Sequence, residues 1–379
     1  MQQVKGIARS IVDKLVKRTN DLSQGRNAGC FGFIDDKGYI SSISEIVDGG
    51  LSGIPLRILL GKLVRIKNNS ILEGIRQLPP NAVFITTRPG KTGLITDVSG
   101  VDFFNLPIVS IGVKEAKNTG VAIIYPEPEF FNLATEAEKL NLATLATTTM
   151  EEEKEILRQS NELGFRFLDV GQELKVLDLP EAPHDQGKRT QVDWRLPRKQ
   201  VNALDKTFAE KLVAKSMEIG QGREVAALGI VDSQGVVKPK GEIVYGGMGF
   251  VPARLLASSL VDITDKSLLL IYSEYVPEEA VIVHTHPGGT GVMHIGDAQA
   301  GPGTWGRPII AIGHDKDGKI RGATVIEVTD QLFDLADEDE ILSSRYFEAK
   351  TPEEEGEIRN RKFGIAQDYT GLCKPIELS

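Results

Sequence analysis

The sequence is poor in cysteine, and its two cysteines, Cys30 and Cys373, stand far apart in the chain. This excludes a disulfide scaffold or a metal site built from cysteines, and it is typical of a reducing compartment. No apolar run approaches the roughly 20 residues of a membrane-spanning helix. The first residues also lack the hydrophobic core of a signal peptide. We therefore expect a cytoplasmic protein that does not enter membranes.

Basic residues are outnumbered by acidic ones. The chain has 44 Lys and Arg against 53 Asp and Glu, for a formal net charge of -9. An excess of negative charge argues against binding to a phosphate backbone, so we expect no nucleic-acid partner. With 379 residues, of which 41% are hydrophobic, the chain is long enough for two or three ordinary globular domains.

The chain contains an internal repeat. Residues 11–60 align with residues 208–257 at a constant offset of 197, and the offset then drifts through 198 and 201 to 202. Small loop insertions produce such a drift, whereas chance matches would not keep one order along the chain. The aligned pairs include Gly25-Arg26 with Gly222-Arg223, Glu45-Ile46-Val47 with Glu242-Ile243-Val244, and Pro55 and Arg57 with Pro252 and Arg254.

We therefore predict a duplicated domain. The first repeat spans residues 1–180, a linker spans residues 181–200, and the second repeat spans residues 201–379. The linker is polar and contains Pro and Gly without helical periodicity, which indicates a linker or an ordered loop. His184 lies in it, and we expect this side chain to be exposed.

Each repeat is predicted to begin with an amphipathic helix and then to alternate strands and helices. Apolar residues follow four-residue spacing at both starts: Ile7, Ile11 and Leu15 in the first repeat, and Phe208, Leu212 and Met217 in the second. Strands are predicted over residues 30–34, 225–231, 309–312 and 323–328, and further helices over residues 55–64, 252–261, 129–140 and 331–342. This α/β alternation predicts a sheet covered by helices in each repeat.

A cluster of histidines stands in the second repeat. Three of the five histidines of the chain, His284, His286 and His294, precede Asp297 within one short stretch. Residues 280–283 are apolar and predict a buried strand. If that strand continues through His286, the two residues at i and i+2 share a face. Two imidazoles and a carboxylate are the ligand set of a catalytic zinc site, with the fourth position left for water.

This stretch resembles the JAMM motif of the JAB1/MPN metallopeptidases. The motif reads His-x-His-Pro, continues to a Ser, and ends, after two intervening residues, at an Asp. His284, His286, Pro287 and Asp297 match it, and His294 stands at the Ser position. The resemblance implies an α/β fold of two tandem three-layer domains, JAB1/MPN-like and cytidine-deaminase-like, each with a mixed sheet flanked by helices. It also implies a zinc ion, Zn2+, bound by His284, His286 and Asp297.

The resemblance further implies an activity. Members of the family hydrolyse peptide or isopeptide bonds, often after the tail of a ubiquitin-like protein, so we expect a protein or peptide substrate. An active domain of the family is often paired with an inactive one. By this analogy the two repeats pack as an internal pseudo-dimer.

The first repeat lacks every candidate ligand. Thr86, Arg88, Thr96 and Ser99 stand where the second repeat has His284, His286, His294 and Asp297. We therefore expect the first repeat to bind no metal at this position, where Arg88 would place a positive charge.

A zinc hydrolase also needs a carboxylate as general base. Glu242 is matched by Glu45 in the first repeat, which favours a structural role. Glu224 faces Asn27 and is specific to the second repeat, and it precedes an apolar, glycine-containing strand as the catalytic Glu of the family does. We therefore predict Glu224 as the base. His294, or a backbone amide of the glycine-rich loop, is the candidate to stabilise the oxyanion.

Two other functions stay open on the sequence. The first is a non-catalytic scaffold or binding protein with a structural or relic metal site, because the family's Ser is absent. The second is a zinc hydrolase that acts on a small molecule. We also predict roles for two further side chains. His314 is expected to be a core residue whose hydrogen bonds are satisfied, and Trp305 is expected either to line a substrate groove or to pack in the interior.

Overall fold

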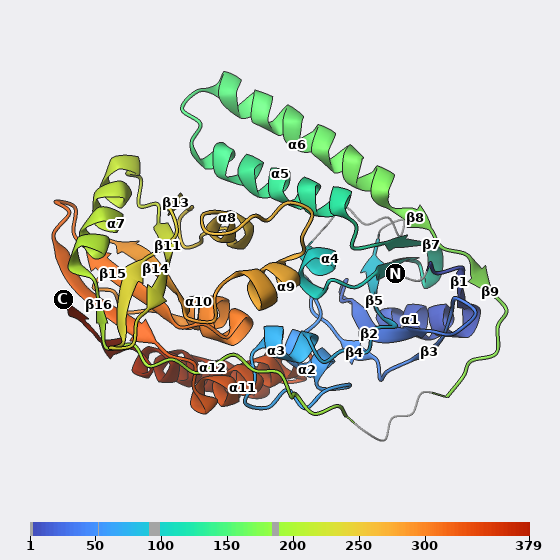
Figure 1. The fold of residues 1–379 in the computed structure, drawn as a ribbon. Coiled ribbons are helices and arrows are strands. Elements are labelled where there is room, and N and C mark those ends of the chain that lie inside the picture. Colours follow the sequence, from blue (N-terminus) through green and yellow to red (C-terminus); the bar gives the residue numbers. More distant parts are fainter. Residues whose placement is uncertain (1–2, 52, 91–98, 184–188) are drawn as a thin grey trace.

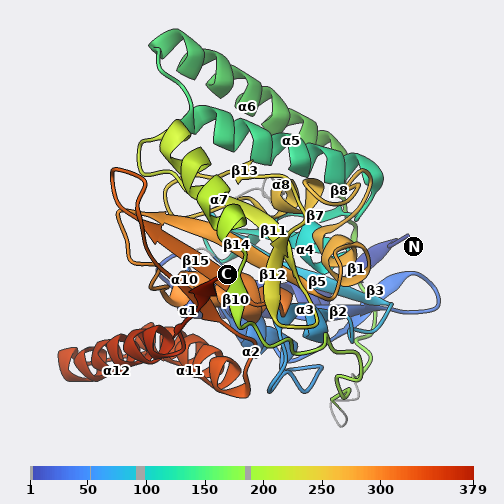
Figure 2. The same cartoon turned by 60° about the vertical axis from the view of Figure 1, so that its left-hand side comes forward.

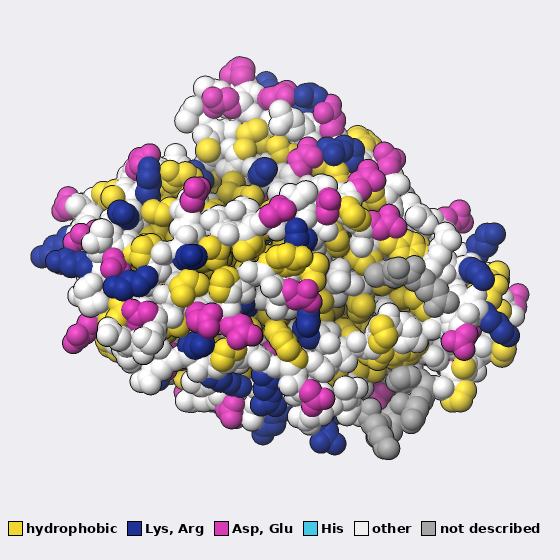
Figure 3. Space-filling model, in the orientation of Figure 1, with side chains coloured by type: hydrophobic (Ala, Val, Ile, Leu, Met, Phe, Trp, Pro, Cys, Tyr) yellow, Lys and Arg dark blue, Asp and Glu magenta, His cyan; other side chains and the backbone are white. Residues whose placement is uncertain are grey.

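A computed structural model describes residues 3–51, 53–90, 99–183 and 189–379 of the chain. The structure is mixed α/β and contains two mixed sheets (Figure 1). In the described residues, no helix combines the length and the apolar character needed to cross a bilayer. On the face in Figure 3, acidic and basic side chains are interspersed rather than segregated, with hydrophobic side chains between them.

The elements of the two repeats follow the same order. The first repeat contains β1 (Gly6–Ala8), α1 (Arg9–Leu22), β2 (Ala28–Ile34), β3 (Tyr39–Ile43), β4 (Val47–Asp48), α2 (Leu56–Leu60), α3 (Ile71–Ile75), β5 (Ala82–Pro89), α4 (Ser99–Phe104), β6 (Ile108–Lys114), β7 (Lys117–Ile124), α5 (Pro128–Leu145), α6 (Met150–Val170), β8 (Gln172–Glu173) and β9 (Val176–Leu177). The second contains β10 (Ala203–Leu204), α7 (Lys206–Ile219), β11 (Val225–Val231), β12 (Val236–Pro239), β13 (Val244–Tyr245), α8 (Ala253–Ser258), α9 (Leu268–Leu270), the π-helical η1 (Ile271–Tyr275), β14 (Ala280–Pro287), α10 (Ile295–Ala298), the π-helical η2 (Gln299–Trp305), β15 (Ile309–His314), β16 (Ile320–Ile326), α11 (Asp330–Tyr346), α12 (Pro352–Gly371), β17 (Lys374–Pro375) and β18 (Glu377–Leu378).

Both sheets have the same strand order. The first runs β8-β7-β6-β5-β2-β3-β1-β9 and the second runs β17-β16-β15-β14-β11-β12-β10-β18, with β4 and β13 paired to β2 and β11. The pairing repeats residue by residue: Gly29 of β2 faces Thr86 of β5, and Ala226 of β11 faces His284 of β14. Gly29 and Ala226 are 197 positions apart, and Thr86 and His284 are 198 positions apart, which are the offsets of the repeat in the sequence. Aligned residues therefore occupy equivalent sheet positions.

Apolar residues cover both faces of the second sheet. Val281 and Val283 of β14 pack with Leu212 of α7 on one face. Ile282, on the other face, belongs to a core with Leu332 of α11. Burying such a side chain contributes about 1.5 to 3 kcal/mol relative to leaving it exposed. Successive side chains of β14 therefore pack on opposite faces of the sheet, and this alternation determines which residues reach the candidate site.

The first helix of each repeat differs in part from the prediction. Ile7 lies in β1 rather than in a helix, because it pairs with Ile40 of β3 and Val176 of β9. In the second repeat Met217 is 40% exposed, and Ser216 occupies the buried position instead. The buried position of that turn therefore lies one residue earlier than the apolar spacing predicts.

Other boundaries follow the sequence more closely. The strand predicted over residues 225–231 is β11, and the acidic helices are confirmed as α5 and α11, each longer than predicted. The helices predicted over residues 55–64 and 252–261 are wrong in length, because α2 and α8 have only five and six residues. The acidic runs at residues 150–154 and 353–355, which indicate either a helix N-terminus or a solvated face, lie at the starts of two long helices, α6 and α12. Each follows a threonine N-cap, Thr149 and Thr351, that accepts a backbone hydrogen bond.

Each repeat contains a hairpin of two helices, α5 and α6 in the first and α11 and α12 in the second, and the repeats contact each other through these hairpins. α5 of the first repeat packs on α8 of the second, and α11 of the second packs on α2 of the first (Figures 1 and 2). Glu138 of α5 accepts hydrogen bonds from two backbone N–H groups of α8, at 3.1 and 3.4 Å. Glu340 of α11 accepts from two backbone N–H groups of α2, at 2.8 and 3.1 Å. Each carboxylate therefore satisfies N–H groups at the start of a helix in the other repeat.

Two buried arginines reinforce the same contacts. Arg57 Nε donates to Asp337 Oδ1 at 2.6 Å, and Arg254 Nη1 donates to Asp102 Oδ1 at 2.6 Å. Both of these ion pairs join one repeat to the other. Removing one partner of such a buried pair leaves an uncompensated charge, which is strongly destabilising.

The described part of the linker is an ordered loop. Val192 and Leu196 are buried, and the backbone N–H of Leu196 donates to the buried carboxylate of Glu73. The guanidinium of Arg76 lies 5.0 Å from the ring centroid of Trp194. His184, which was predicted to be exposed, lies outside the described residues.

Candidate metal centre

Two histidines lie side by side at the end of β14. The strand continues past His286 to Pro287, as predicted. His284 and His286 are two residues apart, so they point to the same side of the sheet. Thr285 points to the opposite side, where its hydroxyl accepts a hydrogen bond from the Val225 backbone N–H. The strand geometry thus places both imidazoles on one face.

Glycines bring the following loop back over this face. Gly291 has φ +83°, and a Cβ on Gly313 of β15 would lie only 2.2 Å from the Gly291 nitrogen. No side chain fits into so close an approach of two backbones. The hydroxyl of Thr324 on β16 donates to the Gly291 carbonyl. The loop therefore lies directly on β15 and β16, and the chain returns to the histidines at α10.

The carboxylate of Asp297 meets the two imidazoles. His284 Nε2 lies 2.9 Å from His286 Nε2 and 3.2 Å from Asp297 Oδ1, and His286 Nε2 lies 3.7 Å from Asp297 Oδ2. Ligand atoms around a tetrahedral zinc are about 3.3 Å apart when each bond is about 2.0 Å. The three distances bracket that value. Within the described ranges, these three side chains form the one His, Cys, Asp and Glu group that could hold a metal ion.

The hydrogen bonds also fit a cation. His286 Nδ1 lies 3.2 Å from the Val292 carbonyl oxygen, which can only accept, so Nδ1 carries a proton, and in the neutral imidazole Nε2 keeps its lone pair. Two imidazole nitrogens 2.9 Å apart need a proton or a cation between them. Metal-bound histidines usually donate their other ring nitrogen in this way. His284 departs from that pattern, because its Nδ1 is buried without a partner in the described structure.

The three groups are coupled electrostatically. Burial alone would raise the pKa of Asp297, but hydrogen bonds with His284 and His286 outweigh it and hold that pKa well below its usual range. Burial alone would lower the pKa of His286, but the interaction with Asp297 reverses the direction and raises it. Asp297 is therefore ionised at neutral pH. A metal ion must compete with protons for the histidines, so binding should weaken in acid.

Glu224 lies beside this group. It immediately precedes β11, two residues before Ala226, which pairs with His284, so its side chain shares the face of the histidines. Its backbone is fixed by hydrogen bonds with Gly246 and Gly247. Glu224 is only 9% exposed. Burial raises its pKa, which His284 and His286 partly oppose and Asp297 reinforces.

His294 stands at the rim rather than among the ligands. It is exposed, and its ring is nearly parallel to that of His286, with centroids 6.5 Å apart. Its backbone N–H donates to Asp297 Oδ2 at 2.9 Å and so helps to orient that carboxylate. The group of possible ligands does not include His294.

The remaining sequence candidates lie elsewhere. Glu242 is exposed on the loop before β13. His314 is a satisfied core residue, as predicted, because its ring nitrogens contact the Asp315 carbonyl and the Ser216 hydroxyl. Trp305 is buried and stacks on Tyr272 with centroids 4.1 Å apart, so the packing alternative is the one observed.

One residue near the site was missed in the sequence. Cys373 comes from the far end of the chain, and its Sγ accepts a hydrogen bond from the Met293 backbone N–H at 3.4 Å. It supports the loop between the histidines and Asp297. A lone cysteine just after α12 offers no local pattern that could have indicated this contact.

The first repeat presents different side chains at the same sheet positions. Thr86 is buried opposite Gly29, and Arg88 lies opposite Gly112 of β6 as His286 lies opposite Gly313. Asn27 takes the position of Glu224. Thr96 lies outside the described residues, and Ser99 begins α4.

The described site therefore brings two imidazoles and a low-pKa carboxylate together, with a buried glutamate on the same face of the sheet. Those are the donors of a metal centre with an adjacent proton acceptor. In comparisons with protein-family models, curated proteins and solved structures, nothing matches this chain.

Proposed function

We propose that the protein is a zinc-dependent hydrolase of the JAMM type that cleaves a peptide or isopeptide bond. The observation that carries the proposal is the convergence of His284, His286 and Asp297, with Glu224 on the same face of the sheet. Three protein ligands with nitrogen and oxygen donors are the composition of catalytic rather than structural zinc sites. The fold supports it, since each repeat combines a mixed sheet with helices, as the JAB1/MPN-like three-layer domain does.

His284, His286 and Asp297 would hold the ion, which would supply a Lewis acid and lower the pKa of a coordinated water. Glu224 accepts the proton of the attacking water and passes it to the leaving amine. Its burial suits this role, because a pKa above the usual carboxylate range makes it both a better base at neutral pH and a usable acid afterwards.

Stabilisation of the oxyanion falls to the loop between the strand and Asp297. His294 is exposed at the rim of the site, where its imidazole can reach a bound substrate. Its position corresponds to the Ser of the family's motif. We assign it the role of hydrogen-bond donor to the developing negative charge, which is worth about 3 kcal/mol in comparable sites.

The first repeat acts in this proposal as the inactive partner of the second. Its equivalent positions carry Thr86 and Arg88, which are not zinc ligands at neutral pH. The exchanged contacts of Glu138 and Glu340 hold the two repeats together.

The test compares two glutamates in the same protein. Zinc-loaded wild type, Glu224→Gln and Glu242→Gln are assayed on a library of fluorogenic peptide and isopeptide substrates, and bound zinc is measured in each. We expect Glu224→Gln to retain zinc and to lose about 100- to 10,000-fold in turnover. Glu242→Gln should behave as wild type.

The same experiment separates the alternatives. A zinc-loaded wild type that turns over no substrate in the library would favour a scaffold with a structural metal, for which His294 in place of Ser is the supporting observation. Hydrolysis of small amides alone would favour the small-molecule hydrolase. Full activity in Glu224→Gln would contradict the assigned base.

A further inference from the structure

A cavity of about 670 Å³ lies in the first repeat at the position that corresponds to the metal centre of the second. Its lining includes Asn27, Thr86 and Arg88, which occupy the sheet positions of Glu224, His284 and His286. The cavity is bounded by α4 and α5 and by residues of the second repeat, and these elements meet near the centre of Figure 1. Its volume is within the range of small-molecule sites.

Two buried polar atoms, one on each of two residues that line this cavity, lack hydrogen-bond partners among the described residues. The Arg88 Nε is buried without a hydrogen-bond partner, and no ion pair involves Arg88 in the part of the chain that the structure describes. Asn27 is 8% exposed, and its buried Oδ1 also has no partner. A buried polar group without a partner costs about 1 to 3 kcal/mol, so each such atom needs an explanation. Together they offer a cation and a hydrogen-bond acceptor.

The other charges in the cavity already have partners. Asp102 binds Arg254 at 2.6 Å, and Glu138 accepts from backbone N–H groups of α8. Burial also raises the pKa of Glu138 to about 7, which reduces its negative charge near neutrality. Among the described residues that line the cavity, Arg88 is thus the cation without an ion pair, and it can receive an incoming anion.

An aromatic wall completes the cavity. Phe84, Phe103 and Phe104 line it, with centroids 5.3 Å apart for Phe84 and Phe104 and 5.7 Å apart for Phe103 and Phe104. Phe103 also packs edge-on against Trp305 of the second repeat. Such a wall accepts a flat apolar group through offset or edge-to-face contacts.

We propose that this cavity binds a small organic monocarboxylate that carries an aromatic ring and an N–H donor, as an N-acylated aromatic amino acid does. Its carboxylate pairs with the fork of Arg88, its N–H donates to Asn27 Oδ1, and its ring packs on the three phenylalanines. A single negative charge balances Arg88, whereas a free ammonium group would be repelled by it. The first repeat is then a binding domain in which the positions of a metal site have acquired another ligand.

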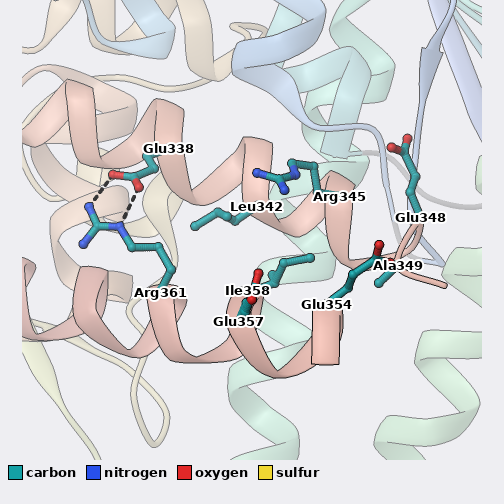
Figure 4. Close-up of a pocket in the computed structure, with 9 residues that line it drawn as sticks. All are labelled: Glu338, Leu342, Arg345, Glu348, Ala349, Glu354, Glu357, Ile358 and Arg361. Carbon is teal, nitrogen blue, oxygen red and sulfur yellow. Dashed lines mark hydrogen bonds and ion pairs between the residues drawn. The ribbon is translucent and has the colours of Figure 1, made fainter. Parts of the chain in front are cut away.

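A second hollow shows why the pairing of charges matters. The groove between α11 and α12, of about 450 Å³, is also rich in charged residues (Figure 4). There, however, Arg361 forms two hydrogen bonds with Glu338. Arg345, an exposed arginine on α11 in the same groove, provides a matched control for Arg88.

The proposal is tested by calorimetric titration of the full-length protein with N-acetyl-L-phenylalanine. We expect saturable binding with one ligand per chain, and at least tenfold weaker binding of N-acetyl-L-phenylalaninamide, which keeps the ring and the N–H but has no charge. Arg88→Gln should weaken binding of the acid about tenfold or more. Arg345→Gln should leave it unchanged.

Thermal unfolding of each variant separates loss of binding from loss of fold. If Arg88→Gln does not fold, Arg88→Lys and Asn27→Leu carry the test, and each is expected to weaken binding of the acid. The proposal is overturned if wild type gives no saturable binding of the acid. Equal binding of acid and amide, or wild-type affinity in the folded Arg88 and Asn27 variants, would overturn it as well.

Discussion

Asn27 and Glu224 stand at the same place in two copies of one framework. Each exchanges backbone hydrogen bonds with a glycine pair, Gly49-Gly50 for Asn27 and Gly246-Gly247 for Glu224, at 2.8 to 3.1 Å. The backbone is the same, yet one position carries a neutral amide and the other a carboxylate. The framework therefore does not decide the chemistry of the position.

The strand beside them shows the same contrast. Thr86 and Arg88 lie in β5 as His284 and His286 lie in β14, with identical pairing to the next strand. In the second repeat the imidazole nitrogens of His284 and His286 lie 2.9 Å apart, whereas in the first the Nε of Arg88 has no hydrogen-bond partner among the described residues. The comparison shows that strand pairing tolerates different side chains at these positions, because the ladder is formed by backbone N–H and C=O groups.

The largest effect should come from removing a ligand on only one side of the comparison. Wild type, His286→Ala and Arg88→Ala are purified from zinc-replete medium, and bound metal is measured by mass spectrometry. We expect about one zinc per chain in wild type and in Arg88→Ala, and none in His286→Ala, because only the second repeat has the ligand set. Two metals per chain would break the comparison, and none in wild type would refute the site.

The second-largest effect is expected at Gly313, where β15 packs directly against the loop that follows β14. In Gly313→Ala the new Cβ would lie 2.2 Å from the Gly291 nitrogen, so the loop must lift from β15. We expect a loss of about 1 to 3 kcal/mol in the free energy of unfolding, together with weaker zinc binding, since Asp297 follows this loop. Gly296→Ala is the control, because nothing lies within 4 Å of a Cβ there. Similar results for both variants would show that the close approach does not position the loop.

The exchanged carboxylates predict a pH dependence of the contact between repeats. Burial raises the pKa of Glu138 and of Glu340 from 4.5 to about 7. A raised pKa favours the protonated form in the folded state, so this contribution is full below about pH 4.5 and is lost as the pH rises through about 7. Between about pH 5 and pH 8, wild type should lose on the order of 1 to 3 kcal/mol more than Glu138→Gln or Glu340→Gln.

Chemical denaturation at the two pH values measures this difference. Glu136→Gln on α5 is the control, because that glutamate forms an exposed pair with Arg166. A pH response in only one of the two buried-glutamate variants would show that the exchange is not energetically symmetric. An unchanged response in both would contradict the assigned origin of the pH dependence.

The smallest effect is expected at the N-caps of α6 and α12, the second helix of each hairpin. Thr149 and Thr351 each accept a backbone hydrogen bond at the start of α6 and α12, at 3.2 Å in both cases. Either threonine changed to alanine should cost about 1 kcal/mol in the free energy of unfolding. Thermal melts of the two variants should shift alike, and a shift in only one would mark a difference between the hairpins.

Much of the fold followed from local patterns. The constant offsets of the repeat, the apolar run before His284 and the acidic helices all depend on neighbouring residues, and strand pairing preserved those offsets residue by residue. The prediction was wrong where a residue distant in the sequence determined the structure. Ile7 has helical spacing, yet it pairs with Ile40 and Val176 and therefore lies in a sheet.

The candidate site was likewise predictable from the sequence only in part. Sequence alone determined the ligand types and the common face of His284 and His286, because residues two apart on a strand point to the same side. Only the tertiary structure decided that Glu224, sixty positions earlier, lies beside them and that Cys373 supports the loop. Contacts between segments so far apart depend on how the whole chain packs, and the same packing leaves the Nε of Arg88 in the first repeat without a hydrogen-bond partner among the described residues.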